Sequence, residues 1–93
     1  MSYKLSFHPD ALVEWRKLEA TVSLQFKKKL AERLQNPRVP SAKLAGNENR
    51  YKIKLRSVGY RLVYEVRDAV LLVIVVTVGK RERNAVYRVA AKR

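Results

Sequence analysis

Hydrophobic and polar residues alternate at the start of the chain and then change to a helical period. Alternation over Tyr3–Phe7 predicts a first strand. Pro9 fits the first position of a helix, with acidic residues near the positive end of its dipole. The apolar positions that follow repeat at helical spacing: Ala11, Leu12, Trp15 and Leu18. A short first helix is therefore expected.

A second and longer helix is predicted from about Val22 to Gln35, with Thr21 as its N-cap. Its buried stripe recurs every four residues: Val22, Phe26, Leu30 and Leu34. Asn36-Pro37 ends this helix. The stretch from there to Arg50 has no clean period, so we expect an ordered surface loop of a length that often carries function.

Strand periodicity returns at Tyr51. Residues 51–56 alternate, residues 60–67 alternate less cleanly, and Val70–Val78 is nearly all β-branched or leucine, as in a strand central to a sheet. Asp68-Ala69 is expected as a tight turn, and Glu82–Ala91 as a short C-terminal helix. The order β-α-α-β-β-β-α predicts one α+β domain over residues 1–93. Its four-stranded sheet is expected to be mainly antiparallel, with an N-terminal helical hairpin and the other helix covering one face.

The alternation also predicts the register of the first hairpin. The apolar sets of its two strands face one core only if paired residue numbers add to an odd value, because a one-residue slip turns a whole set to solvent. A two-residue turn at Val58-Gly59, which pairs Ser57 with Tyr60, meets this condition. Four cations then share the open face: Lys52, Lys54, Arg56 and Arg61.

Charge sharpens this picture. The 21 Lys and Arg residues outnumber 8 Asp and Glu, which gives a net charge of +13 and a field that attracts polyanions, so nucleic acid is the expected partner. Like charges on neighbouring strands repel, so the cationic face is expected to hold an anion. Arg81 ends the last strand, and Tyr87 follows where it can lean over the same face.

Several classes of function are excluded. The chain has no cysteine and a single histidine, His8, so we expect no disulfide framework, no metal site, no cofactor and no two-histidine mechanism. The longest apolar run, Val70–Val76, is too short to span a bilayer, and the N-terminus does not resemble a signal peptide. A cytoplasmic protein without a membrane partner is expected.

RNA carries its own nucleophile, the 2′-OH. Its cleavage needs a base, an acid for the 5′-oxygen and cations that stabilise the extra phosphate charge. His8 is expected to start a helix, and Glu65 and Glu82 are the only acids near the basic face. Because clustered cations disfavour a further positive charge and favour an anion, Lys54 is a candidate proton donor and Tyr87 a candidate base.

Sequence segments along the whole chain resemble the RelE toxins of bacterial type II toxin–antitoxin systems. The likeness includes Tyr51–Ser57 and Gly59–Tyr64. It continues through shorter segments: Trp15–Leu18, Lys27–Leu30, Lys43-Leu44 with Gly46, and Val78–Arg83 with Val86-Tyr87. The resemblance implies a microbial-RNase-like fold and a ribosome-dependent endoribonuclease that cuts the mRNA codon in the A site and leaves a 2′,3′-cyclic phosphate.

The resemblance also implies roles for five residues. Lys54 corresponds to the proton donor, and Lys52 to a lysine that supports it and binds phosphate. Arg61 and Arg81 correspond to arginines that hold the phosphate and stabilise the transition state. Tyr87 corresponds to the tyrosine that stacks on a base, orients the 2′-OH and acts as the base. Further RNA- or ribosome-binding candidates are Arg56, Lys80, Arg83, Lys27 and Lys28.

The partners implied by the resemblance are mRNA on the 70S ribosome, with contacts to 16S rRNA, and an acidic RelB-like antitoxin. Operator DNA is expected to be bound only through the antitoxin complex. Two alternatives stay open. A ParE-like inhibitor of DNA gyrase would lack the five residues above. A non-catalytic protein that binds RNA or the ribosome would lose little from Lys54→Ala or Tyr87→Phe. A DNA-binding regulator is disfavoured because no helix-turn-helix signature precedes Lys27.

Overall fold

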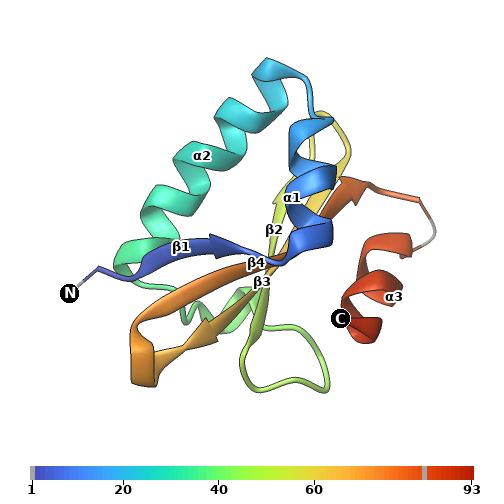
Figure 1. The fold of residues 1–93 in the computed structure, drawn as a ribbon. Coiled ribbons are helices and arrows are strands. Elements are labelled where there is room, and N and C mark those ends of the chain that lie inside the picture. Colours follow the sequence, from blue (N-terminus) through green and yellow to red (C-terminus); the bar gives the residue numbers. More distant parts are fainter. Residues whose placement is uncertain (1, 83) are drawn as a thin grey trace.

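The computed structural model describes residues 2–82 and 84–93, which form a four-stranded sheet with helices on both faces (Figure 1). The first part of the chain contributes one strand and two helices: β1 (Lys4–Phe7), α1 (Pro9–Arg16) and α2 (Ala20–Gln35). The rest contributes three strands and one helix: β2 (Arg50–Leu55), β3 (Tyr60–Arg67), β4 (Leu72–Lys80) and α3 (Ala85–Lys92). The predicted α+β class and order of elements are confirmed. Of the helices in these two ranges, none has the length and apolar character needed to cross a membrane.

The sheet has the strand order β1-β4-β3-β2 and is mixed. Strands β2, β3 and β4 are antiparallel neighbours, whereas β1 runs parallel to β4, with Lys4 opposite Leu72 and Phe7 opposite Val75. Two helices follow β1 in place of a hairpin turn, which lets the chain cross over before it enters the sheet again. The sheet is therefore antiparallel apart from its β1 edge.

The register predicted for the first hairpin is confirmed, but the predicted turn is wrong. Ile53 pairs with Leu62 and Lys54 with Arg61, so paired numbers add to an odd value. The last pair is Leu55 with Tyr60, and residues 56–59 form a four-residue loop in which the Gly59 N–H donates to the Leu55 carbonyl (2.9 Å). Gly59 supplies the left-handed backbone (φ 71°) at the end of this loop.

The sheet has an apolar layer on each face, so the expectation that helices cover only one face is wrong. Helices α1 and α2 cover the larger core, which includes Phe26, Leu30 and Tyr64. Helix α3 packs on the other face through a smaller cluster: Val63, Val76, Val86 and Ala90. Figure 1 shows α2 and α3 on opposite sides of the sheet.

A bulge in β4 helps to form that smaller cluster. Val63 pairs with Thr77 and Tyr64 with Val75, so Val76 is an extra residue between them. Such an insertion re-aims a side chain. Val76 joins the cluster beneath α3, which the alternation pattern alone did not predict.

Three predicted boundaries differ from the structure. Helix α2 begins at Ala20 because the Glu19 carbonyl already accepts the Ser23 N–H (3.0 Å), and Thr21 lies inside the helix and not at its N-cap. Val70 is 63% exposed in a 3₁₀ turn (Asp68–Val70), and Leu71 reverses the chain in a left-handed conformation before β4 begins. Helix α3 begins three residues later than predicted, because Asn84 has a left-handed backbone.

The predicted surface loop between α2 and β2 is ordered, and it contains a short 3₁₀ helix (Pro40–Ala42). Arg38 holds it from within: its guanidinium donates to the Asp68 carboxylate (2.7 Å), the Asn49 side-chain oxygen (3.0 Å) and the Glu48 carbonyl (3.2 Å). Leu44 bonds back to the start of β2 through the Arg50 carbonyl (2.8 Å). Residues 44–47 are thereby fixed beside β2.

Candidate active site

Three strands bring the predicted cations together. Lys54 on β2 lies directly opposite Arg61 on β3, and Arg61 lies opposite Gly79 on β4. Arg81 follows β4, and its backbone N–H donates to the Gly59 carbonyl (2.6 Å) in the hairpin loop. The hairpin and the end of β4 therefore place Lys54, Arg61 and Arg81 around one point.

A small cavity of about 130 Å³ lies at that point. Its walls come from the hairpin, the end of β4 and the start of α3: Lys54, Arg61, Arg81, Glu82, Asn84, Ala85, Val86 and Tyr87. At about 30 Å³ per water molecule, the cavity has room for about four waters. That is the size of a phosphate group and not of a whole nucleotide.

Arg61 is the most buried cation of the site, with 7% of its surface exposed. The sequence predicted an open face here, but α3 covers it. The guanidinium donates to the Tyr60 carbonyl (3.1 Å), and within residues 2–82 and 84–93 it forms no ion pair. A buried charge without a partner is costly, so this position favours the binding of an anion.

The pKa of the Lys54 ammonium is lowered from its ordinary value of 10.5. The positive charge of Lys52 is the largest cause, followed by a partial loss of solvation and by the charges of Arg61, Arg56 and Arg81. Each of these disfavours a further positive charge at Lys54. The predicted direction of the effect of the cation cluster on the Lys54 pKa is confirmed, and the role of Lys54 as proton donor stays a prediction.

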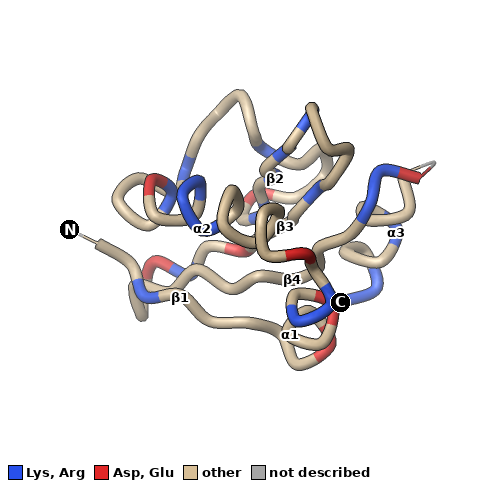
Figure 2. The backbone as a smooth tube through the Cα atoms, turned by 90° about the horizontal axis from the view of Figure 1, so that it is seen from above, with Lys and Arg blue, Asp and Glu red and all other residues tan. Residues whose placement is uncertain are grey.

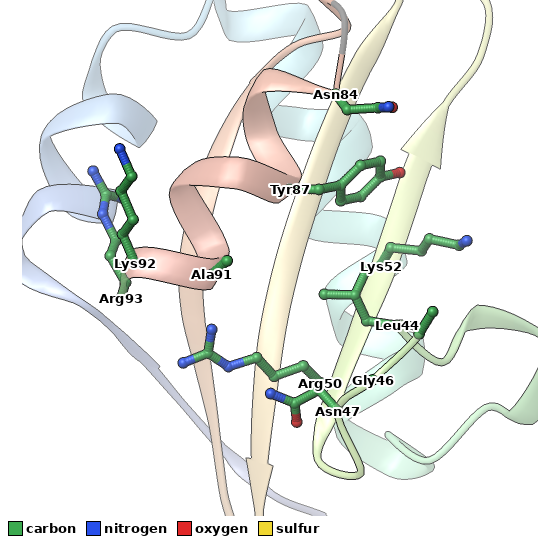
Figure 3. Close-up of a pocket in the computed structure, with 11 residues that line it drawn as sticks. Leu44, Gly46, Asn47, Arg50, Lys52, Asn84, Tyr87, Ala91, Lys92 and Arg93 are labelled. Carbon is green, nitrogen blue, oxygen red and sulfur yellow. The ribbon is translucent and has the colours of Figure 1, made fainter.

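Tyr87 reaches the site from α3, which Val86 and Ala90 anchor on the sheet. Figure 3 shows its ring extending from α3 toward β2. The Tyr87 hydroxyl is buried and has no hydrogen-bond partner in the described part of the chain. An unsatisfied buried hydroxyl costs about 1–3 kcal/mol, so it is poised to bond a group that enters the site.

Two predicted residues, one on β2 and one just after it, flank the cavity without lining it. Lys52 lies two residues before Lys54 and faces a neighbouring cleft that also contains Tyr87. Arg56, just after β2, lines a shallow depression at the sheet edge together with Lys52 and Lys54. Both add positive charge beside the cavity.

Three other predicted binding residues, Lys80, Lys27 and Lys28, do not join the site. Lys80 lines a separate depression that contains Glu14 and Glu82. Lys27 and Lys28 are exposed on α2, which covers the opposite face of the sheet from α3. Arg83 lies outside the described residues.

Sequence reasoning missed Asn84, which lines both the cavity and the neighbouring cleft. The predicted helix began at Glu82 and so hid it. Asn is one of the few residues that tolerate its positive φ of 63°, and this tolerance was the only available signal. The expectation for His8 is confirmed: it caps α1 by accepting the Asp10 N–H (3.1 Å).

Ion pairs in the described ranges lie away from the cavity. They join Glu14 to Arg93, Asp68 to Arg38, and Glu65 to both Arg50 and Arg67. Figure 2 shows how few Asp and Glu positions there are beside the many Lys and Arg positions. The cations of the site are therefore left available for an external anion.

Known proteins resemble this chain over its full length. A family profile described as "ParE toxin of type II toxin-antitoxin system, parDE" matches residues 5–85. The "mRNA interferase toxin RelE" of Escherichia coli K12 is 57% identical over 93 residues, which cover 100% of this chain and 98% of that protein. A solved structure of a mutant E. coli RelE toxin in the free state is 55% identical, with a TM-score of 0.92 and coverage of 100% and 98%.

A second solved structure shows a mutant E. coli RelE toxin in complex with an antitoxin RelB peptide; it is 55% identical, with a TM-score of 0.85 and coverage of 100% and 98%. The profile match shows membership of the ParE toxin family, and the high identity over the full length shows that the chain is a RelE toxin within that family. The chain belongs to the RelE toxins, within the ParE toxin family of type II toxin–antitoxin systems.

Proposed function

We propose that this protein is a ribosome-dependent mRNA interferase, formed by one RelE-like toxin domain over residues 1–93. It cuts the mRNA codon in the A site of the 70S ribosome. The buried guanidinium of Arg61, which has no ion-pair partner among the described residues and lies beside Lys54 in a phosphate-sized cavity, is the observation that carries this proposal. The name of the E. coli relative, an mRNA interferase, supports the same activity.

In the proposed reaction the 2′-oxygen of one nucleotide attacks the adjacent phosphorus. Tyr87, acting as the phenolate, takes the 2′-OH proton and becomes the phenol, and the Lys54 ammonium gives a proton to the departing 5′-oxygen and becomes the amine. A P–O2′ bond forms and the P–O5′ bond breaks, which leaves a 2′,3′-cyclic phosphate and a free 5′-OH. Arg61 and Arg81, with Lys52 beside them, stabilise the charge that builds up on the non-bridging oxygens.

We also propose a RelB-like acidic antitoxin as the protein partner. The solved complex of a RelE toxin with a RelB peptide and the net charge of +13 support it. Operator DNA is bound only through that complex. On the ribosome, Arg56, Lys80 and Arg83 are candidate contacts to mRNA or 16S rRNA, and Lys27 and Lys28 are candidates for a more distant contact.

Primer extension on mRNA in programmed ribosomes tests the proposal. The wild-type protein should produce cuts inside the A-site codon, and a Lys54→Ala, Arg81→Ala double variant should not. Tyr87→Phe, which keeps the ring and removes the hydroxyl, should slow cleavage by about 10²- to 10⁴-fold. The matched control is Arg16→Ala, Lys17→Ala, because these two exposed cations lie at the end of α1 and just after it, away from the cavity.

Each alternative predicts a different result. Ribosome binding without cuts would leave a non-catalytic ribosome-binding protein. If the protein neither bound ribosomes nor cut mRNA but inhibited DNA gyrase, its function would be that of the ParE toxins that give the family profile its description. Equal cleavage by the wild-type protein and the Lys54→Ala, Arg81→Ala variant would show that the cavity is not the active site.

A further inference from the structure

The carbonyl of Ala90, near the end of α3, accepts a hydrogen bond from a side chain of β2. The donor is Nη1 of Arg50, and Figure 3 shows this side chain extending from β2 toward the end of α3. The last carbonyls of a helix lack their usual intrahelical partners and carry the negative end of its dipole. A guanidinium at this end therefore adds a hydrogen bond and complements the dipole.

The pairing of β2 with β3 orients Arg50 for this contact. Arg50 lies opposite Glu65 in the sheet, and its Nε donates to the Glu65 carboxylate (3.1 Å). Only 12% of the Arg50 side chain is exposed. Because the guanidinium is planar and its donors are fixed relative to one another, binding of Nε by Glu65 leaves Nη1 for α3. Glu65, Arg50 and the Ala90 carbonyl thus form one line of polar contacts from β3 to α3.

Helix α3 needs support at its end because it is short. It has 8 residues, and isolated helices of fewer than about 12 residues are marginal in water. Its buried residues are Val86 and Ala90, both of which have small side chains. The position of the helix on the sheet therefore depends on polar contacts as well as on apolar packing.

Tyr87 is the residue of α3 that such a contact would affect most. It precedes Ala90 by three residues, so the two lie on adjacent turns of one side of the helix. Its hydroxyl is buried, and it lines the small cavity, which Arg50 does not. Misplacement of a reacting group by about 1 Å can slow a reaction by about 10²-fold. A contact at Ala90 can therefore change the rate without touching the scissile phosphate.

We propose that Arg50 is a positioning residue for Tyr87, held by Glu65 and acting through the Ala90 carbonyl and α3. This inference rests on the proposed function, in which Tyr87 is the base. Loss of Arg50 should slow the cleavage step and change the affinity for ribosomes little, because alignment of the base matters in the transition state.

Fluorine NMR of the protein with 3-fluorotyrosine at its 5 tyrosines reads the Tyr87 ring directly. The Tyr87 signal is assigned by its loss in Tyr87→Phe. In Arg50→Met this signal should shift or broaden, whereas that of Tyr3, near the other end of the chain, should not. An unmoved Tyr87 signal in Arg50→Met would overturn the proposal.

Arg67→Met is the matched control. Arg67 donates to the same Glu65 carboxylate (2.9 Å), but within the described ranges it forms no hydrogen bond to α3. Its replacement should leave the Tyr87 signal in place. An equal change in Arg67→Met and Arg50→Met would assign the effect to Glu65 alone and overturn the role of the Ala90 contact.

Single-turnover cleavage on programmed ribosomes separates positioning from binding and from stability. Arg50→Met should lower the maximal rate by about tenfold to 10²-fold, while the ribosome concentration that gives half of this rate changes by less than about twofold. Arg50→Lys keeps a charge beside Glu65 but lacks the second donor nitrogen, so it should restore the free energy of unfolding more than the rate. Rates that follow the unfolding free energy across these variants would show a merely structural role and overturn the proposal.

One further outcome separates this proposal from the proposed function. If the wild-type protein makes no cuts on ribosomes, the nuclease is contradicted, and the Tyr87 fluorine signal still decides whether Arg50 positions the ring. A signal that moves in Arg50→Met but not in Arg67→Met would then support the contact through α3.

Discussion

Arg61 and Lys54 are paired across two strands, yet they respond differently to the same crowding of positive charge. A lysine can lose its proton when neighbouring cations disfavour its charge, whereas a guanidinium keeps its charge at any ordinary pH. Lys54 can therefore serve as a proton donor, and Arg61 as a permanent charge. Their positions fit this difference, because Arg61 is the buried member of the pair and Lys54 the exposed one.

The lowered pKa of Lys54 predicts the alkaline limb of the pH–rate profile. The donor must be protonated, so cleavage should fall as pH rises through the pKa of Lys54, below the ordinary lysine value of 10.5. Lys52→Met removes the largest cause of the shift, so the limb should move to higher pH even though the maximal rate falls. Single-turnover cleavage across pH measures it. Lys80→Met, whose charge does not contribute to the shift, is the control, and an unmoved limb in Lys52→Met would contradict the assignment of Lys54.

Arg61 is buried without an ion-pair partner among the described residues. We therefore expect its replacement to raise stability and to lower activity. Arg61→Met removes a buried charge that lacks an ion-pair partner in the described structure, so the free energy of unfolding should rise by about 1 kcal/mol. Cleavage should fall by about 10²-fold or more. Urea unfolding and a cleavage assay measure the two effects.

Arg50 provides the matched control, because it is also largely buried but pairs with Glu65. Arg50→Met should lower the free energy of unfolding, since it removes the more buried partner of the Glu65 carboxylate and leaves that carboxylate only the exposed Arg67. If Arg61→Met destabilised the protein as much as Arg50→Met does, Arg61 would be a structural residue and not a charge kept for a ligand.

The carboxylate of Glu14 connects α1 to β4 and to the residue that follows α3. Glu14 on α1 accepts from both terminal nitrogens of Arg93 (2.9 and 3.1 Å), from the Thr77 hydroxyl (2.9 Å) and from the Val78 N–H (3.3 Å). Arg93 also donates to the Val76 carbonyl (3.0 Å). The residue that follows α3 is thus tied to α1 and β4, and this contact helps to hold Tyr87 over the cavity.

This contact predicts a pH-dependent stability. Burial alone would raise the pKa of Glu14, but hydrogen bonds from Arg93, Thr77 and the Val78 N–H outweigh it, so the pKa is lowered. Its stabilisation is therefore present above the ordinary value of 4.5 and is lost as pH falls through the lower pKa of the folded state. Glu14→Gln should cost about 1 kcal/mol of unfolding free energy at pH 7 and much less near pH 3.

Urea unfolding at several pH values measures this difference, with Glu32→Gln on the exposed surface of α2 as the control. Hydrogen exchange should show faster opening of α3 in Glu14→Gln. A cost that is the same at pH 3 and pH 7 would mean that the carboxylate charge is not what holds α3.

Local patterns predicted the elements, but contacts distant in sequence decided their arrangement. The spacing of apolar residues was enough to predict both N-terminal helices and the hairpin register. It could not show that β1 pairs with β4, because strand pairing across some 70 residues leaves no local signal. Burial of Arg61 was missed for a similar reason: α3 covers it from the other end of the chain. At Val70 a local signal was misleading. Its β-branched side chain favours a strand, which was predicted to begin there, but the residue lies in an exposed 3₁₀ turn.

At the scale of the whole molecule, the unbalanced charge predicts a strong dependence of RNA binding on salt. Four cations are placed to contact phosphate: Lys52, Lys54, Arg61 and Arg81. For single strands, the logarithm of the affinity should therefore fall with the logarithm of the salt concentration with a slope of about −3. Fluorescence anisotropy with a 2′-O-methyl oligonucleotide measures it. An Arg81→Ala variant should have a slope shallower by about 0.7, and an unchanged slope would remove Arg81 from the contact set.

The parallel pairing of β1 with β4 also bears on how this protein is made. The first strand to leave the ribosome finds its hydrogen-bonded neighbour only in residues 72–75, so the sheet cannot close while the later part is still being translated. Arg81 and α3 emerge later still. A growing chain therefore contains some of the cations but not the cavity that they line in the folded protein. The cavity can form only after the ribosome has synthesised the C-terminal residues.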